Sequence, residues 1–393
     1  MERIGKRDLR KRHQILKVFM KLKLLTVLGT RPEIIKMGQV LQKADKYFDH
    51  VIAHTGQNFD YELNEVFFND LGLRKPDHFL SAAGSNPATT IANVIIKVDE
   101  LIDIVKPDAF LLYGDTNSCL SVISAKRKKI PVFHLEAGNR CFDQRVPEEI
   151  NRKIVDHLSD VNMVHSEHAR RYLLNEGIRP ELIFKVGSPM YEIFEKYKTK
   201  IESSNALNDL KLKPKDYFLV SMHREENVDY EENLISLLES LNFIAEKFNR
   251  TVIVSTHPRT RNAMDKLKNF KISEKVFFMK PMGFFDYVKL QKNAFCVLSD
   301  SGTITEESAI LRFPAVMIRQ AHERPEGMDV GAVIMSGISK ESIEQSIVMA
   351  TEMNVTNFEH IEAYDRLGFS DQVIKIIQSY TGYVNRTVWR KNV

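Results

Sequence analysis

Cysteine is scarce in this chain, which has only three among 393 residues: Cys119, Cys141 and Cys296. Their positions contain no CxxC pair, no zinc-ligand spacing and no disulfide framework. The sequence therefore predicts reduced thiols, a cytoplasmic location and no bound metal. Long apolar runs are missing too, because none approaches the ~18 residues that would span a bilayer. We expect no contact with a membrane.

A surplus of charge is also missing from most of the chain. The formal net charge is +4, but nine Lys/Arg and only two Asp/Glu fall within residues 1–23. The remainder is close to neutral and has no electrostatic footprint for nucleic acid. Residues 1–20 form a basic N-terminal extension that either binds an anionic surface or has no role. No apolar segment typical of a secretory signal follows these charges.

Two common nucleotide-binding motifs are absent. No GxGxxG follows any predicted strand, and the chain contains no GxxxxGK[ST]. A tightly bound NAD and ATP hydrolysis are therefore both disfavoured, and we expect no cofactor.

Short β-rich segments alternate with segments of helical period, which is typical of parallel βαβ units. The two halves repeat one plan, because each opens with an apolar strand ending in a polar loop and contains a later strand ending in a Gly-Asp or Ser-Asp turn. The predicted strands are residues 24–28, 50–53, 109–113, 132–134 and 162–164, then 217–221, 252–255, 276–279, 295–298 and 315–318. We predict an α/β protein with two Rossmann-like, doubly wound domains facing across a cleft.

The predicted boundaries follow from this repeat and from the chain length, which suits two domains. Residues 21–190 form the first domain, with the acid/base residues, and residues 191–369 form the second, with the nucleotide site. Residues 370–393 are expected to form a helix that returns to the first domain.

Acidic residues stand at predicted strand ends of the first half, where doubly wound sheets bind ligands. Asp115 lies in a Gly-Asp-Thr turn, and Glu136 follows the strand at residues 132–134. Glu148 and Arg152 are four residues apart on one helix face, either as a surface salt bridge or as part of an acid/base cluster. Clustered carboxylates and cations suit proton transfer, because neighbours separate their pKa values.

Cations flank the first strand-to-helix turn of the first half. Arg31 and Lys36 stand where a positive charge opposes the helix dipole, so stability alone would not favour them. They predict an anionic ligand.

A turn of small residues in the second half predicts a phosphate site. Ser301, Gly302 and Thr303 place backbone N–H groups and hydroxyls at a helix start, and Glu307 could accept hydrogen bonds from ribose hydroxyls. The alternative is a capping box with Ser or Thr as the N-cap. His223, at the end of a predicted strand, is expected to contact a diphosphate.

Together these motifs resemble the non-hydrolysing UDP-N-acetylglucosamine 2-epimerases, from about residue 20 to about residue 378. The resemblance rests on Gly29-Thr-Arg-Pro-Glu-Ile-Ile-Lys36, Thr55-Gly-Gln57, Gly114-Asp-Thr116, His134-Leu-Glu-Ala-Gly138, Pro147-Glu-Glu-Ile-Asn-Arg152, His223-Arg-Glu225, Ser299-Asp-Ser-Gly302 with Glu307, and Glu323-Arg-Pro-Glu326.

The resemblance implies the fold of B-type glycosyltransferases, a UDP-sugar substrate, no redox cofactor and a homodimer. It also implies inversion at C2 by anti elimination of UDP to a 2-acetamidoglucal, followed by re-addition of UDP. The implied catalytic residues are Asp115, Glu136, Glu148 and His223, with Asp115 and Glu148 as proton carriers on opposite faces and Glu136 positioning the substrate. The implied binding residues are Arg31, Lys36 and Arg152, with His223, for the diphosphate, and Ser301, Gly302, Thr303 and Glu307 for phosphate and ribose.

Some residues depart from the commonest family pattern, and these leave the sugar open. Thr303 replaces a glycine, and the segment 139–146 is short and begins with Asn139. This segment resembles the branch that converts UDP-2-acetamido-2,6-dideoxy-L-talose to UDP-N-acetyl-L-fucosamine for capsule or O-antigen synthesis. Interconversion of UDP-GlcNAc and UDP-ManNAc is the other possibility within the family. A B-type glycosyltransferase that uses a UDP-sugar is the alternative outside it.

Overall fold

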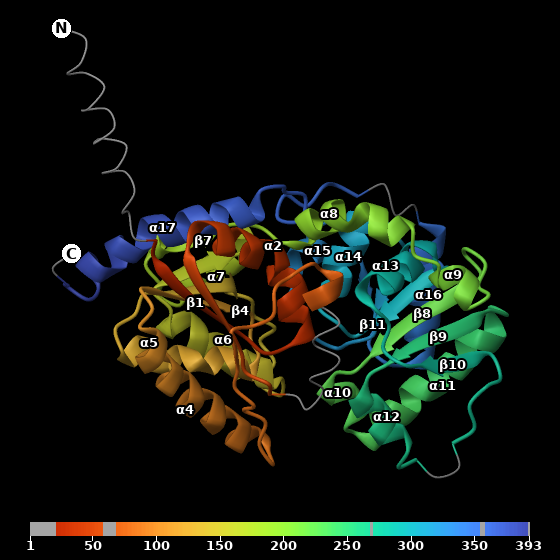
Figure 1. Ribbon diagram of the computed structural model, residues 1–393. Coiled ribbons are helices and arrows are strands. Elements are labelled where there is room, and N and C mark those ends of the chain that lie inside the picture. The colour runs from red at the N-terminus through yellow and green to blue at the C-terminus, as the bar shows by residue number, and fades with distance from the viewer. Residues whose placement is uncertain (1–20, 58–67, 268–269, 354–357, 392–393) are drawn as a thin grey trace, which may run out of the picture.

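The structure is a computed structural model that describes residues 21–57, 68–267, 270–353 and 358–391. The predicted basic extension, residues 1–20, lies outside the described residues. Two α/β halves lie side by side, the first coloured red to yellow and the second green to blue (Figure 1). No helix in the described ranges is long and apolar enough to cross a membrane.

The first half is built on a parallel sheet of seven strands in the order β3-β2-β1-β4-β5-β6-β7. The strands are β1 (Lys23–Leu28), β2 (Asp49–His54), β3 (His78–Phe79), β4 (Ala109–Tyr113), β5 (Val132–Ala137), β6 (Val161–Val164) and β7 (Ile183–Lys185). The helices are α2 (Arg31–Tyr47), α4 (Pro87–Val105), η1 (Asn117–Ser121), α5 (Val122–Arg127), α6 (Pro147–Leu158), α7 (Glu167–Asn175) and η2 (Pro180–Leu182).

The second half has a parallel sheet of six strands in the order β10-β9-β8-β11-β12-β13. The strands are β8 (Tyr217–Met222), β9 (Thr251–Thr256), β10 (Val276–Met279), β11 (Cys296–Ser299), β12 (Ala315–Met317) and β13 (Ile334–Met335). The helices are α10 (Glu225–Val228), α11 (Glu231–Lys247), α12 (Pro258–Met264), α13 (Phe284–Asn293), α14 (Thr303–Leu311), α15 (Pro325–Asp329) and α16 (Lys340–Glu352). Three further helices are α8 (Met190–Glu202), α9 (Ala206–Asp209) and α17 (Phe369–Thr387).

The prediction of two doubly wound α/β sheets is confirmed. In each sheet the first strand pairs with the next strand of the chain on one side and with a later strand on the other, at β1–β4 and at β8–β11. Such reversals of strand order are where ligands bind. Each predicted strand is present. The prediction missed β3, β7 and β13, because two or three residues carry no readable alternation.

Proline at the first helical turn helps several helices to begin. Pro87 starts α4, Pro147 starts α6 and Pro258 starts α12. The fixed φ of proline suits this position, where its missing N–H costs nothing. The chain therefore turns from coil to helix at defined residues, and α6 carries Glu148 and Arg152 from a definite starting point.

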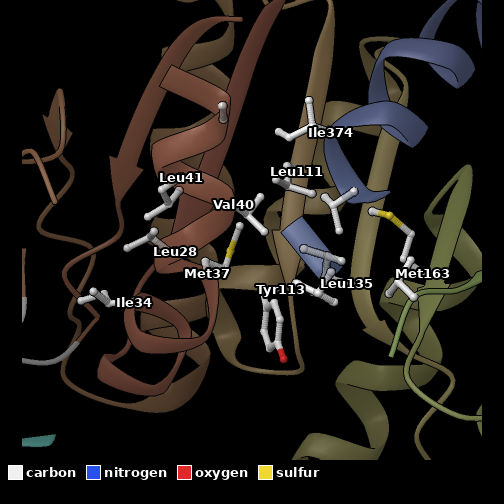
Figure 2. Close-up of a cluster of buried hydrophobic side chains, with 14 of the residues drawn as sticks. Leu28, Ile34, Met37, Val40, Leu41, Leu111, Tyr113, Leu135, Met163 and Ile374 are labelled. Atoms are coloured by element: carbon white, nitrogen blue, oxygen red, sulfur yellow. The ribbon is translucent and has the colours of Figure 1, made fainter. Parts of the chain in front are cut away.

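One apolar cluster of the first half lies between its sheet and helices α2 and α17 (Figure 2), and a second lies on the other face of the sheet, against α4 and α5. Met37 and Val40 of α2 are fully buried beside Leu111 and Leu135 of the sheet, and Ile374 of α17 joins the same cluster. Full burial of one such side chain stabilises the fold by about 1.5–3 kcal/mol. In this way α17, which follows the second half in the chain, is held against the first (Figure 1).

Helix α8 ties the two halves together. Ser188 just before it contacts Glu306 of α14. Phe194 stacks on Phe284 of α13, with ring centroids 6.2 Å apart, and the Tyr197 hydroxyl donates to the carbonyl of Leu71 at 2.7 Å. The apolar cluster of the first half therefore continues into the second, which holds the polar edges of the two sheets in contact.

Candidate active site

The predicted site residues lie at the carboxyl ends of strands in both halves. Asp115 follows β4 and Glu136 lies near the end of β5, while His223 follows β8. The two edges touch, because Arg224 Nη1 lies 3.3 Å from Glu148 Oε1. The structure thus brings the acidic set of the first half and the predicted phosphate set of the second into one neighbourhood.

Glu136 stands at a bulge in β5, where the pairing with β6 shifts between residues 135 and 137. Its φ is 63°, a left-handed value that strains any residue other than glycine. The carboxylate is only 9% exposed and lies 2.7 Å from Lys36 Nζ and 2.9 Å from Arg324 Nη2. Burial alone would raise the pKa of Glu136, but these two cations hold it well below its ordinary value. Glu136 is therefore a fixed, buried anion.

A buried chain of charges continues from Glu136 into the second half. The Arg324 guanidinium, itself buried, also contacts Glu306 at 2.9 Å. Burial opposes the ionisation of Lys36, but Glu136 and Glu306 raise its pKa above the ordinary value. Opposite charges alternate along this chain, which compensates each for its loss of water.

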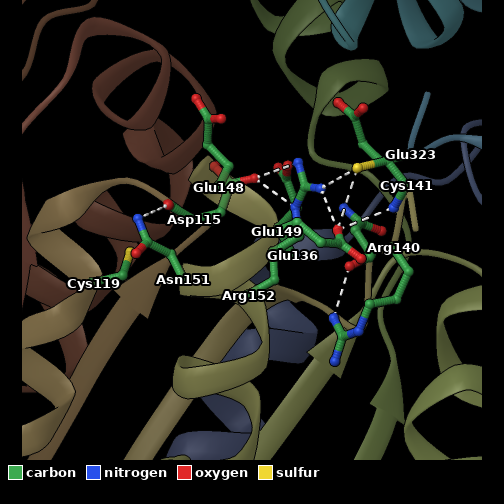
Figure 3. A network of polar contacts seen from close by, with 12 residues as sticks. Asp115, Cys119, Glu136, Arg140, Cys141, Glu148, Glu149, Asn151, Arg152 and Glu323 are labelled. Carbon is green, nitrogen blue, oxygen red and sulfur yellow. Dashed lines mark hydrogen bonds and ion pairs between the residues drawn. The ribbon is translucent and has the colours of Figure 1, made fainter. Parts of the chain in front are cut away.

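Asp115 is held by a guanidinium rather than by a backbone network (Figure 3). Arg152 places Nε and Nη2 each 2.8 Å from Asp115 Oδ2, and its Nη1 donates to Glu149 Oε2 at 2.9 Å. Glu148 instead reaches Arg224 of the other half. The alternative of a surface salt bridge between Glu148 and Arg152 is therefore wrong, since Arg152 is buried between two other carboxylates.

Exposure separates the three predicted acids. The side chain of Asp115 is 24% exposed and that of Glu148 is 34% exposed, against 9% for Glu136. Asp115 and Glu148 are thus more open to a bound molecule than Glu136, which lies between its two cations.

A buried carboxylate organises the loop that carries His223. Asp300 accepts from the backbone N–H groups of His223 and Arg224, both at 2.9 Å, and from the Asn227 amide at 3.1 Å. His223 Nδ1 also lies 3.1 Å from Asp300. Burial raises the pKa of Asp300, but the His223 charge and these hydrogen bonds outweigh it and lower the pKa to about 2. His223 is therefore oriented by a permanent anion.

The start of α14 has the shape expected of a phosphate site. Gly302 is the N-cap, so the alternative of a Ser or Thr capping box is wrong. A Cβ on Gly302 would lie 2.0 Å from Glu323 Oε1, which explains the need for glycine. The hydroxyls of Ser301 and Thr303 lie 3.0 Å apart beside the first turn. Helix-start amides with such hydroxyls favour a bound anion.

Glu307 and Arg31 complete the predicted set. Glu307 lies in α14, where Gln291 donates to it and burial raises its pKa. Arg31 opens α2 in the first half, and burial is the main cause that lowers its pKa. Burial raises the pKa of Tyr287 in α13 above its ordinary value, and the charge of Glu307 raises it further while that of Arg31 lowers it.

Sequence reasoning missed several charged residues of this network. Asp300 and Glu306 stand inside the Ser-Asp-Ser-Gly segment and its helix, and Arg324 stands in the Glu-Arg-Pro-Glu motif, so both motifs held a usable signal. Glu149 was overshadowed by its neighbour Glu148. Its spacing of three from Arg152 could have indicated the pair.

The chain is similar to known UDP-sugar 2-epimerases in sequence. Residues 41–378 match the UDP-N-acetylglucosamine 2-epimerase family. A UDP-N-acetylglucosamine 2-epimerase of Methanocaldococcus jannaschii is 36% identical over 337 residues, which cover 83% of this chain and 91% of that protein. A UDP-2,3-diacetamido-2,3-dideoxy-D-glucuronate 2-epimerase of Pseudomonas aeruginosa is 33% identical over 332 residues, covering 83% and 91%.

Solved structures of UDP-N-acetylglucosamine 2-epimerases are similar to this chain as well. The UDP-N-acetylglucosamine 2-epimerase from Rickettsia bellii is 52% identical with a TM-score of 0.88, covering 94% of this chain and 100% of that chain. The Methanocaldococcus jannaschii enzyme in complex with UDP-GlcNAc and UDP is 32% identical with a TM-score of 0.85, covering 91% and 100%. A glycotransferase of kitacinnamycin at 10% identity and a TM-score of 0.58 shares the fold alone.

The two doubly wound sheets, together with the similarity to solved UDP-N-acetylglucosamine 2-epimerases, place the chain in the class of nucleotide-sugar enzymes with the B-type glycosyltransferase fold. Within that class the chain belongs to the UDP-N-acetylglucosamine 2-epimerase family, and it is an isomerase. The family assignment favours the epimerase over the glycosyltransferase alternative.

Proposed function

We propose that this enzyme inverts C2 of a UDP-N-acetylhexosamine by eliminating UDP and adding it back to the resulting 2-acetamidoglucal. The observation that carries the proposal is the meeting of two accessible carboxylates, Asp115 and Glu148, with the predicted phosphate edge of the second half. Inversion at C2 needs a base that removes the weakly acidic proton from one face and an acid that delivers a proton to the other. The departing diphosphate needs donors fixed before the reaction.

The two partly exposed acids are the proposed proton carriers. Asp115 comes from the sheet edge and Glu148 from α6, so they approach from different elements. Glu136 keeps its charge between Lys36 and Arg324, which suits a residue that positions the substrate. One of the two carriers removes the C2 proton, and the other delivers its own proton, which exchanges with solvent, to the opposite face of the glycal.

The diphosphate is proposed to lie against the start of α14, with His223 and Arg31 beside it. Ser301, Gly302 and Thr303 supply amides and hydroxyls there, and Glu307 is proposed to accept from the ribose hydroxyls. Lys36 and Arg152 were also predicted to bind the diphosphate. Both are in direct ion pairs with carboxylates of the first half, so their part in phosphate binding is secondary in this proposal.

Two further proposals concern the oligomeric state and the cellular location of the enzyme. We propose a cytoplasmic homodimer, supported by the resemblance to the family and by the three cysteines, which are free thiols in the structure. Light scattering of the purified protein should give twice the chain mass, and a monomer mass at micromolar concentration would contradict the dimer. Cell fractionation should place the protein in the cytoplasmic fraction, and recovery from another fraction would contradict the location.

The substrate is tested by NMR of the purified enzyme with three UDP-sugars in parallel. These are UDP-GlcNAc, UDP-2-acetamido-2,6-dideoxy-L-talose and UDP-2,3-diacetamido-2,3-dideoxy-D-glucuronate. We expect a C2 epimer mixture with at least one, reached from either epimer without an added cofactor. Release of UDP only when an acceptor sugar is added would contradict the proposal and support a glycosyltransferase.

A further inference from the structure

We propose that Glu149 is a positioning residue that orients Asp115 through Arg152. The inference rests on the proposed function, because that function makes Asp115 a proton carrier. Glu149 does not reach the surface, since its side chain is 0% exposed, so it acts on the reaction only through its neighbours.

The Glu149 carboxylate accepts hydrogen bonds from two elements, helix α6 and the segment 139–146 (Figure 3). Oε2 accepts from Arg152 Nη1 at 2.9 Å and from the Cys141 backbone N–H at 3.1 Å, while Oε1 accepts from the Phe142 N–H at 3.2 Å. The Cys141 thiol lies 3.4 Å from the same Oε2. One buried anion thus joins the helix that carries Arg152 to the segment 139–146.

The position of Asp115 depends on the hydrogen bond between Glu149 and Arg152. A guanidinium is planar, so anchoring Nη1 on Glu149 fixes the plane in which Nε and Nη2 point. Both of these atoms meet Asp115 Oδ2 at 2.8 Å. If Glu149 no longer held Nη1, the fork could rotate and Asp115 would lose its fixed direction.

The segment held by Glu149 is itself strained. Phe142 has a φ of 57°, although it is not glycine, and its ring is largely exposed. A non-glycine residue in this region persists only where its surroundings impose it. The hydrogen bond from Phe142 N–H to Glu149 is one such constraint. Glu149 therefore sets the shape of the segment as well as the direction of Arg152.

A different role for Arg152 makes a different prediction. If Arg152 binds the diphosphate, loss of its anchor should weaken binding of UDP itself. If it orients Asp115, UDP should bind normally while turnover falls, because the proposed UDP contacts belong mainly to the second half. Calorimetry with UDP and steady-state kinetics together separate the two roles.

The test compares Glu149→Gln with a matched control, Glu176→Gln. Glu176 holds the same segment through the adjacent residue Arg140, at 2.8 and 2.7 Å, but does not contact Arg152 or Asp115 in the described part of the chain. For Glu149→Gln we expect kcat to fall by about 10- to 100-fold, since a misplacement of ~1 Å can cost about 10²-fold. KM and the Kd for UDP should stay within about twofold. Glu176→Gln should keep kcat within about threefold.

Non-additivity tests the route through Arg152. The double variant Glu149→Gln/Arg152→Lys should have the kcat of Arg152→Lys alone. Arg152→Lys already removes the guanidinium that Glu149 orients, so the loss of Glu149 has no further effect on Asp115. Glu149→Asp, which keeps the charge, should recover part of the activity and replaces Glu149→Gln if that variant does not fold. Multiplicative losses, a raised Kd for UDP, or equal losses in Glu176→Gln would overturn the inference. A wild-type enzyme with no C2 chemistry would instead overturn the proposed function.

Discussion

Each half uses one buried carboxylate to join the two loops at its strand reversal. In the first half, Glu33 accepts from the N–H groups of Gly29 and Thr30 after β1 and from the Thr116 hydroxyl after β4. In the second half, Asp300 after β11 accepts from the N–H groups after β8. The architecture is the same, but the pKa values of the two carboxylates shift in opposite directions.

The neighbours explain the difference. Burial raises the pKa of Glu33 to about 7, because its hydrogen bonds only partly offset the loss of water and the Asp115 charge adds to the rise. Burial acts on Asp300 as well, but His223 and the backbone donors lower its pKa to about 2. Burial therefore dominates the pKa of Glu33, whereas His223 and the backbone donors dominate that of Asp300. The comparison teaches that the partners around a buried carboxylate, rather than its place in the fold, decide the direction in which its pKa shifts.

The largest expected effect comes from removing the proton carriers. Asp115→Asn and Glu148→Gln should each lower kcat by about 10²- to 10⁴-fold, the usual contribution of general acid–base catalysis. Their Kd for UDP should stay near that of the wild type if the second half holds the nucleotide. Steady-state kinetics and calorimetry check this, and near-normal turnover in both variants would remove these acids from the mechanism.

Breaking the link between the halves should mainly affect stability. Arg324→Gln leaves Glu136 and Glu306 buried without their shared cation, and breaking a buried pair costs about 3–5 kcal/mol. Urea unfolding should show this loss. A matched control is Arg259→Gln, whose partners Glu225 and Asp229 are exposed, and it should change stability by less than about 1 kcal/mol. Equal stability of Arg324→Gln and the wild type would contradict the role of the buried chain.

The two buried carboxylates should leave opposite signatures in stability against pH. The folded pKa of Glu33 is raised, so its contribution is full below pH 4.5 and is lost as the pH rises towards 7, by about 3 kcal/mol. The folded pKa of Asp300 is lowered, so its contribution of about 2 kcal/mol is present above pH 3.8 and is lost as the pH falls towards 2.

Urea unfolding from pH 2 to 8 of the wild type, Glu33→Gln and Asp300→Asn checks these windows. Glu33→Gln should flatten only the window from pH 4.5 to 7, and Asp300→Asn only the window below pH 3.8. Identical profiles for the two variants would mean that the halves do not differ as described.

The smallest effect is expected at the start of α14. Gly302→Ala places a Cβ against Glu323 and should cost about 1–3 kcal/mol of stability, as overpacking usually does. It should also weaken UDP binding, whereas Gly72→Ala, with no atom within 4 Å but a φ of 62°, should lower stability alone. Unchanged UDP affinity in Gly302→Ala would argue against a phosphate at this turn.

Much of the fold was predictable, because parallel strands buried on both faces stand out as short apolar runs. The strand ends also placed Asp115, His223 and the turn at Gly302 at the carboxyl ends of β4, β8 and β11, where the structure has them. The direction of Glu136 was not predictable, since it depends on a bulge with a positive φ that no local pattern announces. Nor was the contact of Arg152 with Asp115, because it depends on how two segments 37 residues apart in the sequence meet.

The most direct measurement is NMR of UDP-GlcNAc, and then of the 6-deoxy-L-talo sugar nucleotide, in D₂O with the wild-type enzyme. We expect deuterium to appear at C2 of both epimers, and we expect Asp115→Asn and Glu148→Gln to slow this exchange. Tight binding of UDP without exchange at C2 of these two sugars or of UDP-2,3-diacetamido-2,3-dideoxy-D-glucuronate would contradict the account.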